Sequence, residues 1–164
     1  MIDLKEIKNK ILKKENFYFL LIILFVFSLD RYSKTEIIKN FSDTSFYFND
    51  FLNLDLVWNT GIGFGLLSDN NQFFYNLITL LIGVVVMCLF YIAIKSNKYE
   101  KIIFSSIIGG ALGNFYDRLY FKAVPDFIDL HYERFHWFTF NVADIFITIG
   151  LILYILSGLL KKNK

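Results

Sequence analysis

The chain has 164 residues, of which 55% are hydrophobic and 20 are phenylalanine, a larger apolar content than the core of a soluble domain of this length needs. A net charge of +2 argues against nucleic acid as a partner, and the single cysteine, Cys88, excludes an internal disulfide and a cysteine-rich metal site. One proline and no low-complexity tract leave no linker, so we expect one integral membrane domain over residues 1–164.

Four apolar segments are the candidate membrane helices. Phe17–Leu29 follows a lysine-rich start but has no small-x-small cleavage site, so we interpret it as a retained helix rather than a signal peptide. Phe73–Ile94 has 22 residues without a charge and is long enough to span a bilayer. The 11-residue run Ile102–Leu112 and the 24-residue run Trp137–Leu160 follow. We expect a membrane all-α fold, a four-transmembrane-helix bundle.

The first and third segments are too short to span the membrane alone. At ~1.5 Å per residue, 13 residues cover roughly 20 Å of a ~30 Å hydrocarbon core. Each helix must therefore continue through the polar residues that follow it. This places helices at about 17–39, 73–95, 101–121 and 137–160, with polar groups at the C-terminal ends of the first and third.

Two connecting regions are predicted to differ in structure. In 41–72, Leu52–Leu56 alternates with period two and Asn59–Gly65 has the composition of a turn, so we expect a small extracytoplasmic β element. Lys122–His136 mixes apolar and polar residues, and we expect it to lie along the membrane as an amphipathic piece. Asp129 and Glu133 within it are interpreted as solvated loop charges.

Basic residues indicate the orientation. Three stretches contain 11 of the 17 lysines and arginines, and four spans place these stretches on one side, which the positive-inside rule assigns to the cytoplasm. They comprise Lys5, Lys8, Lys10, Lys13, Lys14, Lys95, Lys98, Lys101, Lys161, Lys162 and Lys164. Both termini are then cytoplasmic, and the polar helix ends lie near the outer leaflet.

Asp144 is the only charged residue in the run 137–160. A carboxylate at membrane depth costs about 2.5–3.5 kcal/mol, which marks it as functional. Counted from Phe138, it lies about 9 Å below the start of its helix, at a depth similar to that of Asp126. Carboxylates that share a proton perform catalysis in aspartic proteases. We therefore interpret Asp126 and Asp144 as one site.

Five motifs follow one another along the chain, namely Asp30–Lys34, Asn59–Gly65, Gly109–Arg118, Val124–Phe127 and Phe140–Asp144. In this order they resemble those of the signal peptidase II family, the lipoprotein signal peptidases of bacterial inner membranes. The departures are small: Gly63 stands where the family usually has alanine, and Ser33 where it has threonine.

The resemblance implies an aspartic endopeptidase without cofactor or metal. Asp126 and Asp144 would hold a water between them as general base and general acid. The implied substrate is a prolipoprotein that carries diacylglycerol on a cysteine and is cut just before it, in contact with membrane lipid. Inhibition by globomycin is also implied, and we expect a monomer.

Supporting roles remain open between function and structure. Asp30 and Asn59 would anchor the outer loop or substrate, Asn114 would orient substrate, and Asn141 would contact peptide or tune its neighbour. Arg118 would pair with Asp117 or with another carboxylate of the site. The alternatives are an ordinary Asp30–Lys34 helix pair, a structural Asp117–Arg118 pair and glycines that only allow close packing. The supporting set is Asp30, Lys34, Asn59, Gly61, Asn114, Asp117, Arg118 and Asn141.

Other functions fit the sequence less well. His131 and His136 lack a helical His-Glu-x-x-His pattern, so we expect no zinc site there. A proton-coupled carrier would spread its charges along a path across the membrane, whereas these lie at one depth, and no internal repeat is visible. A scaffold would not need an aspartate pair, and no lysine lies within an apolar run to activate a serine. Cys88 is interpreted as a packing residue.

Overall fold

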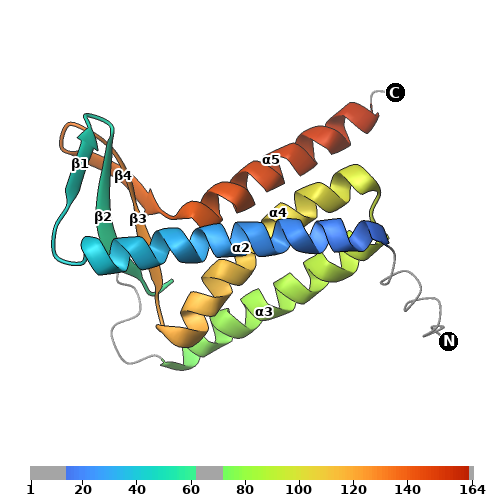
Figure 1. The fold of residues 1–164 in the computed structure, drawn as a ribbon, viewed down its shortest axis with the longest axis horizontal. Coiled ribbons are helices and arrows are strands. Elements are labelled where there is room, and N and C mark those ends of the chain that lie inside the picture. Colours follow the sequence, from blue (N-terminus) through green and yellow to red (C-terminus); the bar gives the residue numbers. More distant parts are fainter. Residues whose placement is uncertain (1–13, 62–71, 163–164) are drawn as a thin grey trace.

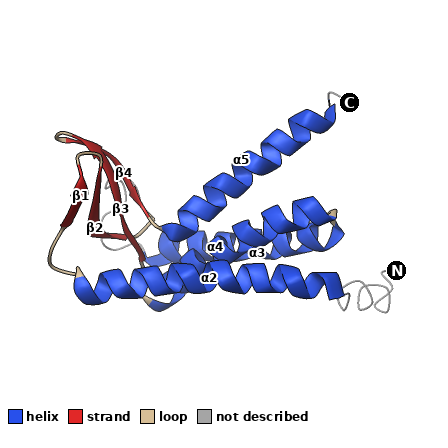
Figure 2. Cartoon of the chain, turned by 45° about the horizontal axis from the view of Figure 1, so that its top comes forward, coloured by secondary structure: helices blue, strands red, loops and turns tan. Residues whose placement is uncertain are grey.

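The structure is a computed structural model that describes residues 14–61 and 72–162. The elements run in the order α2 (Lys14–Asn40), β1 (Phe46–Asn49), β2 (Leu52–Asn59), α3 (Gln72–Lys95), α4 (Lys98–Tyr120), β3 (Val124–Tyr132), β4 (Phe135–Phe140) and α5 (Val142–Lys162). The sheet lies at one end of the helices, and α2 begins and α5 ends at the other end (Figures 1 and 2). The predicted lysines Lys5, Lys8, Lys10, Lys13 and Lys164, and motif residues 62–65, lie outside the described residues.

The four predicted helices are present in the described part of the chain, together with a small sheet. Three helical segments are long and apolar enough to cross a membrane, namely Asn16–Asn40, Gln72–Lys95 and Val142–Leu160. The helix α4 is not among them. It packs against α2, α3 and α5, so much of its surface contacts protein. Its lower apolarity follows from this central position.

Small residues on α4 allow its neighbours to approach closely. A Cβ on Gly109 would lie 2.7 Å from the Cβ of Val26 in α2, and a Cβ on Gly110 would lie 2.6 Å from the backbone oxygen of Ala143 in α5. Both distances are shorter than real carbon contacts, so only glycine fits. The core beside them consists of Ile23, Ile103, Phe104, Ile107 and Ile108. The packing interpretation of these glycines is confirmed.

The sheet is antiparallel, with its strands in the order β1-β2-β3-β4. The prediction of strands in 41–72 is correct, but two of the four strands come from elsewhere in the chain. Lys122–His136 is not an amphipathic surface piece, because it forms β3 and the start of β4. The predicted helix 137–160 begins too early, since residues 135–140 pair with β3 and α5 begins at Val142. Cross-strand pairing decides the structure of this aromatic stretch.

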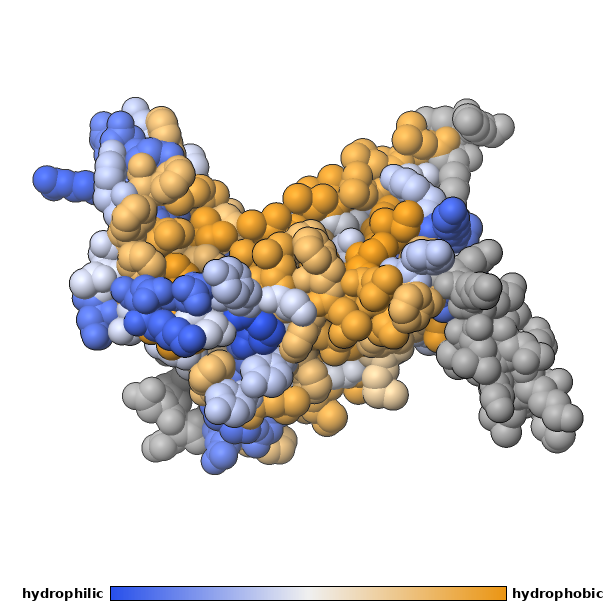
Figure 3. All heavy atoms as spheres, in the orientation of Figure 1, coloured by the Kyte–Doolittle hydropathy of each residue, from blue (hydrophilic) through white to orange (hydrophobic). Residues whose placement is uncertain are grey.

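The outer surface of the helices is strongly apolar (Figure 3). Large side chains such as Leu80 on α3, Phe25 on α2 and Ile155 on α5 are exposed by 60% or more of their area. Exposed apolar side chains along whole helices form a larger apolar surface than the patches found on soluble monomers. Polar residues gather instead around the sheet end of the molecule (Figure 3). The exterior is that of a membrane protein.

Candidate active site

Asp126 is positioned by strand pairing. It lies near the start of β3, opposite Val57 of β2, and is only 3% exposed. The side-chain amide of Asn59, at the end of β2, donates to its Oδ2 at 2.8 Å. The amide of Asn141 donates to its Oδ1 at 2.6 Å. Both carboxylate oxygens of Asp126 therefore accept hydrogen bonds from neutral groups.

Asp144 is positioned by the start of α5. The backbone N–H of Asp144 donates to the side chain of Asn141 at 3.1 Å, and the backbone N–H of Asn141 donates to the Asp144 carboxylate at 3.2 Å. This reciprocal pair is a capping box with Asn and Asp in the two positions. It fixes Asp144 in the first helical turn, where the helix dipole favours a negative charge. The side chain of Asn114 donates to its other oxygen at 2.8 Å.

Asn141 joins the two aspartates. It is fully buried, and its side chain bonds Asp126 while its backbone bonds Asp144. Among the described residues no cation lies within ion-pair distance of either carboxylate. Burial raises the pKa of Asp126, the hydrogen bonds from Asn59 and Asn141 lower it, and the charge of Asp144 raises it further. Asn141, which the sequence predicted to contact the peptide or to tune its neighbour, therefore contacts both acids.

A buried ion-pair network lies behind this pair. Lys34, with no exposed area, donates to Asp30 at 2.9 Å, to Asn114 at 2.8 Å and to Asp117 at 2.7 Å. Arg31 lies 2.5 Å from Asp117 and 3.3 Å from Asp30. Asp30–Lys34 is therefore more than an ordinary exposed helix pair. Asn114 connects the network to the site, because it accepts from Lys34 and donates to Asp144.

Asp30 also fixes the start of α5. It accepts a hydrogen bond from the backbone N–H of Ala143 at 3.0 Å, so it ties α2 to the helix that carries Asp144. A Cβ on Gly113 would lie 2.3 Å from the Asp30 carboxylate, so glycine is required beside it. The observed contacts of Asp30 lie within the helices, and its expected role in anchoring the outer loop or the substrate stays a prediction.

Arg118 does not pair with Asp117, so the structural pair that the sequence left open as an alternative is not formed. Asp117 forms ion pairs with Lys34 and Arg31 instead. Arg31 was not predicted as a site residue, although it lies inside the first motif. The guanidinium of Arg118 lies beneath Gly61, where a Cβ would be 2.6 Å from Nη1, and Gly61 has a φ of +77°. Buried Nε and Nη1 of Arg118 have no hydrogen-bond partner in the part of the chain that the structure describes.

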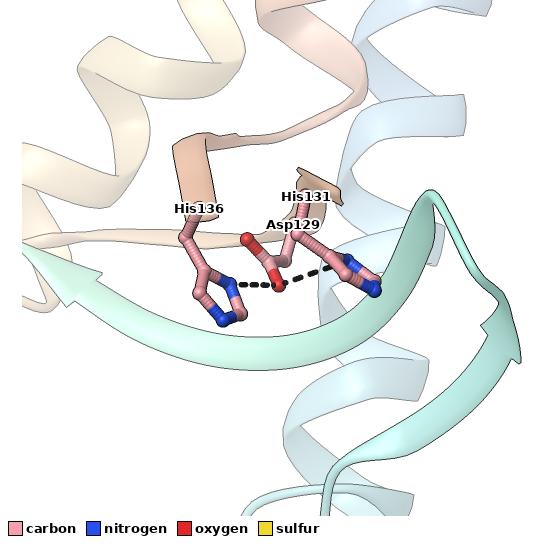
Figure 4. A group of neighbouring side chains, drawn as sticks. All are labelled: Asp129, His131 and His136. Atoms are coloured by element: carbon pink, nitrogen blue, oxygen red, sulfur yellow. Dashed lines mark hydrogen bonds and ion pairs between the residues drawn. The ribbon is translucent and has the colours of Figure 1, made fainter. Parts of the chain in front are cut away.

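A second cluster lies further along β3. Asp129, expected to be a solvated loop charge, is 4% exposed and hydrogen-bonded at 2.7 Å to His136 (Figure 4). That expectation is wrong, because the hairpin β3–β4 encloses the carboxylate. Glu133 is exposed in the turn, as expected.

Comparison with known proteins identifies the family. Residues 22–160 match the family model described as Signal peptidase (SPase) II. The chain belongs to the signal peptidase II family. It is 48% identical over 159 residues to the lipoprotein signal peptidase of Pelagibacter ubique (strain HTCC1062), covering 95% of this chain and 96% of that one. It is 38% identical over 160 residues to that of Francisella tularensis subsp. novicida (strain U112), covering 90% and 94%.

Solved structures agree with this assignment. Two bacterial membrane enzymes determined by the in meso method resemble the chain with TM-scores of 0.71 and 0.73. The first is 36% identical and covers 90% of each chain, and the second is 34% identical and covers 87% of this chain and 92% of its own. As a member of the signal peptidase II family, the protein is a protease of bacterial membranes. The described residues of the five motifs named from the sequence lie together in the structure, around Asp126, Asp144 and Asn141.

Proposed function

We propose that the protein removes the signal peptide from diacylglyceryl-modified prolipoproteins as an aspartic endopeptidase, with Asp126 and Asp144 as its catalytic pair. The supporting observation is the joint attachment of both carboxylates to Asn141, with neutral amides as their other partners. Carboxylates held together without a cation share a proton, and one acid with one base is what water-mediated peptide hydrolysis requires. The pair titrates as a unit.

In this mechanism a water molecule between the aspartates attacks the scissile carbonyl. The ionised aspartate removes a proton from the water, and the protonated one donates its proton to the carbonyl oxygen, which gives a neutral gem-diol. Transfer of a proton to the leaving amine then breaks the C–N bond and leaves a new carboxyl group. The aspartate that took a proton from water supplies the one that reaches the amine, and the other aspartate regains its proton from the gem-diol. Because water is the nucleophile, no covalent intermediate with the protein forms.

We assign the proton to Asp126 and the charge to Asp144. Burial and the neighbouring charge both raise the pKa of Asp126. Asp144 lies in the first turn of α5, where backbone N–H groups favour an anion. The raised pKa of Asp126 favours its protonated form, as expected of the general acid of such a pair. Asp144 then activates the water, and Asp126 protonates the carbonyl oxygen.

The other site residues have proposed roles in holding the substrate. The Nε and Nη1 groups of Arg118, which have no hydrogen-bond partner among the described residues and lie close to Gly61, are suitable donors to a peptide carbonyl. Asn59 donates to Asp126 and Asn114 donates to Asp144, and each retains capacity to contact the peptide. Lys34, Asp30 and Asp117 fix α2 against α4 behind the site.

The proposed membrane placement follows from the same geometry. We infer that α4 is a fourth span, since it runs beside three apolar helices. The lysine pattern then places both termini in the cytoplasm of a bacterial inner membrane and the sheet outside. The catalytic pair lies where the helices meet the sheet, near the outer leaflet, so that the acyl chains of a substrate remain in lipid. We expect a monomer that needs no cofactor and is inhibited by globomycin.

The decisive experiment replaces each acid by its amide. Asp126→Asn and Asp144→Asn keep the side-chain shape but cannot act as the base or as the ionised partner. Each is therefore expected to abolish cleavage of a diacylated prolipoprotein, which is detected by measuring the mass of the products. Asp55→Asn, an exposed carboxylate of β2, is the matched control and should retain activity. Near-normal turnover in either amide variant would remove that residue from the pair.

A further inference from the structure

The hairpin β3–β4 brings the only two histidines of the chain together beside an aspartate. His131 and His136 are directly opposite each other across the strands, and Glu133 and Arg134 complete the turn. Opposed residues in an antiparallel pair have neighbouring side chains on one face. Asp129 precedes His131 by two residues and therefore shares that face. The fold, not sequence proximity alone, assembles these three side chains.

The atoms of the cluster point toward a common centre (Figure 4). Nδ1 of His136 lies 2.7 Å and Nδ1 of His131 lies 3.6 Å from the same oxygen of Asp129. One ligand atom from each of the three residues falls within 4.8 Å of the others. The ligands of a tetrahedral Zn²⁺, with bonds of 2.0–2.1 Å, stand roughly 3.3 Å apart. The cluster reaches that geometry when ligand separations of up to 4.8 Å close to roughly 3.3 Å through movement of the side chains.

One buried atom of the cluster has no partner. His131 is 6% exposed, and its Nδ1 forms no hydrogen bond with any described residue. An unpaired buried polar atom is costly, and here it faces a carboxylate from a distance too long for a hydrogen bond. A cation between them would satisfy both groups. His136 is exposed over 57% of its side chain, which leaves room for its ring to move and for water to complete the coordination.

We propose that Asp129, His131 and His136 bind one divalent transition-metal ion, of the class that Zn²⁺ represents. Two imidazoles and one carboxylate suit zinc and its first-row neighbours, and they are poor ligands for calcium or magnesium, which prefer oxygen. The sequence alone argued against such a site, because it lacks a helical zinc motif. A strand hairpin supplies the same convergence by cross-strand pairing.

This site is separate from the catalytic pair. Asp126 and Asp129 are three residues apart on β3, and side chains alternate along a strand, so they lie on opposite faces. The ion would join β3, which carries Asp126, to β4, which leads directly into Asn141. It therefore stabilises the sheet that positions the proposed acids, without taking part in the reaction.

Metal binding is tested on the full chain in detergent micelles, purified by a tag without histidine and freed of metal by a chelator. Calorimetric titration with Zn²⁺ should give one ion per chain, and Co²⁺ should produce the visible absorption of a tetrahedral site. At about 100 times the dissociation constant, Zn²⁺ should raise the thermal midpoint by roughly 5 °C or more.

Three variants distinguish binding at this site from nonspecific metal binding. His136→Gln, at an exposed position that does not threaten folding, should weaken Zn²⁺ binding by about tenfold or more. Asp129→Asn retains a hydrogen-bond acceptor for His136 but loses the anionic ligand, so it should weaken binding while the metal-free protein stays folded. Glu133→Gln, an exposed carboxylate between the histidines, is the matched control and should bind Zn²⁺ normally.

Two results would overturn the proposal. One is the absence of Zn²⁺ binding by the intact protein. The other is equal affinity for Zn²⁺ in the intact protein and in His136→Gln. His131 is then the only histidine left, so binding would not depend on the proposed pair of histidines. Cleavage activity measured in the same preparations reports on the catalytic pair separately, so failure here leaves the proposed protease mechanism standing.

Discussion

Replacing Lys34 by methionine should strongly destabilise the protein. The ammonium group is fully buried and donates to Asp30, Asn114 and Asp117 at 2.7–2.9 Å. Methionine keeps most of the length of the side chain, but it leaves two buried carboxylates with less compensating charge. Removing one partner of a buried ion pair costs about 3–5 kcal/mol. The loss is a charge effect more than a packing effect.

The lower end of that range applies here. Arg31 remains within 2.5 Å of Asp117 and 3.3 Å of Asp30, and its side chain is 17% exposed, so it compensates in part. We expect a loss of about 3 kcal/mol, which for a chain of this size corresponds to roughly 6–12 °C in the thermal midpoint. Asn114 loses its donor and holds Asp144 less firmly, so cleavage should slow even where the protein is folded.

Thermal unfolding in detergent, followed by intrinsic fluorescence, measures the effect. Lys98→Met, at an exposed position at the start of α4, is the matched control and should shift the midpoint by about 2 °C or less. Asp117→Asn should cost less in the Lys34→Met background than in the intact protein, because the uncompensated charge is then removed. Equal midpoints for Lys34→Met and Lys98→Met would refute the buried network.

Further outcomes are expected. Gly110→Ala should destabilise the protein by about 1–3 kcal/mol through its clash with α5, whereas Gly158→Ala, which lies inside a helix and meets nothing within 4 Å, should not destabilise it and should add up to about 1 kcal/mol of stability in the same unfolding assay. Asn59→Ala removes a hydrogen bond that lowers the pKa of Asp126, so the alkaline limb of the rate–pH profile should move to higher pH; a move to lower pH would contradict the assignment of the proton. A diacylated substrate should be cleaved far faster than the same peptide with a free cysteine, because each buried CH₂ contributes ~0.8 kcal/mol to confinement at the membrane; equal turnover at saturation would exclude this specificity. Chelators and serine- or cysteine-directed reagents should leave cleavage intact, although a chelator should lower the thermal midpoint of zinc-loaded protein; loss of cleavage that zinc restores would implicate the histidine cluster in the reaction.

The helices were predictable because bilayer thickness sets their length. Hydrophobic runs and the need to continue short runs through Asp30 and Asn114 placed α2 and α4 to within three residues of their observed ends. The start of α5 was missed by five residues, although Asn141 and Asp144 have the spacing of a capping box. The aromatic run 135–140 looked like membrane helix because composition alone does not distinguish a strand from a buried helix.

The strand pairing of the site was beyond sequence reasoning. The prediction brought Asp126 and Asp144 to one depth, but which groups hold them depends on the pairing of β2 with β3 across more than 60 residues of chain. That pairing aims Asn59 at Asp126, and it also buries Asp129. The sequence left the partner of Arg118 open, and the alternative pair with Asp117 does not form because Lys34 and Arg31 of α2 bind Asp117, a tertiary contact that spacing within α4 does not reveal.

Cations contact the structural aspartates, whereas neutral amides contact the two proposed catalytic aspartates. This difference accounts for a proposed site that is both rigid and able to exchange a proton. A cation in contact with Asp126 or Asp144 would stabilise the ionised form and prevent the pair from sharing a proton. The structure instead places Lys34 and Arg31 on Asp30 and Asp117, where charge fixes α2 to α4. Asn114 accepts from Lys34 and donates to Asp144, so a neutral amide connects this network to the proposed catalytic pair. Amide donors stabilise either protonation state far less selectively than a cation does, so in the proposed mechanism the acids are held in place while the proton remains free to move between them.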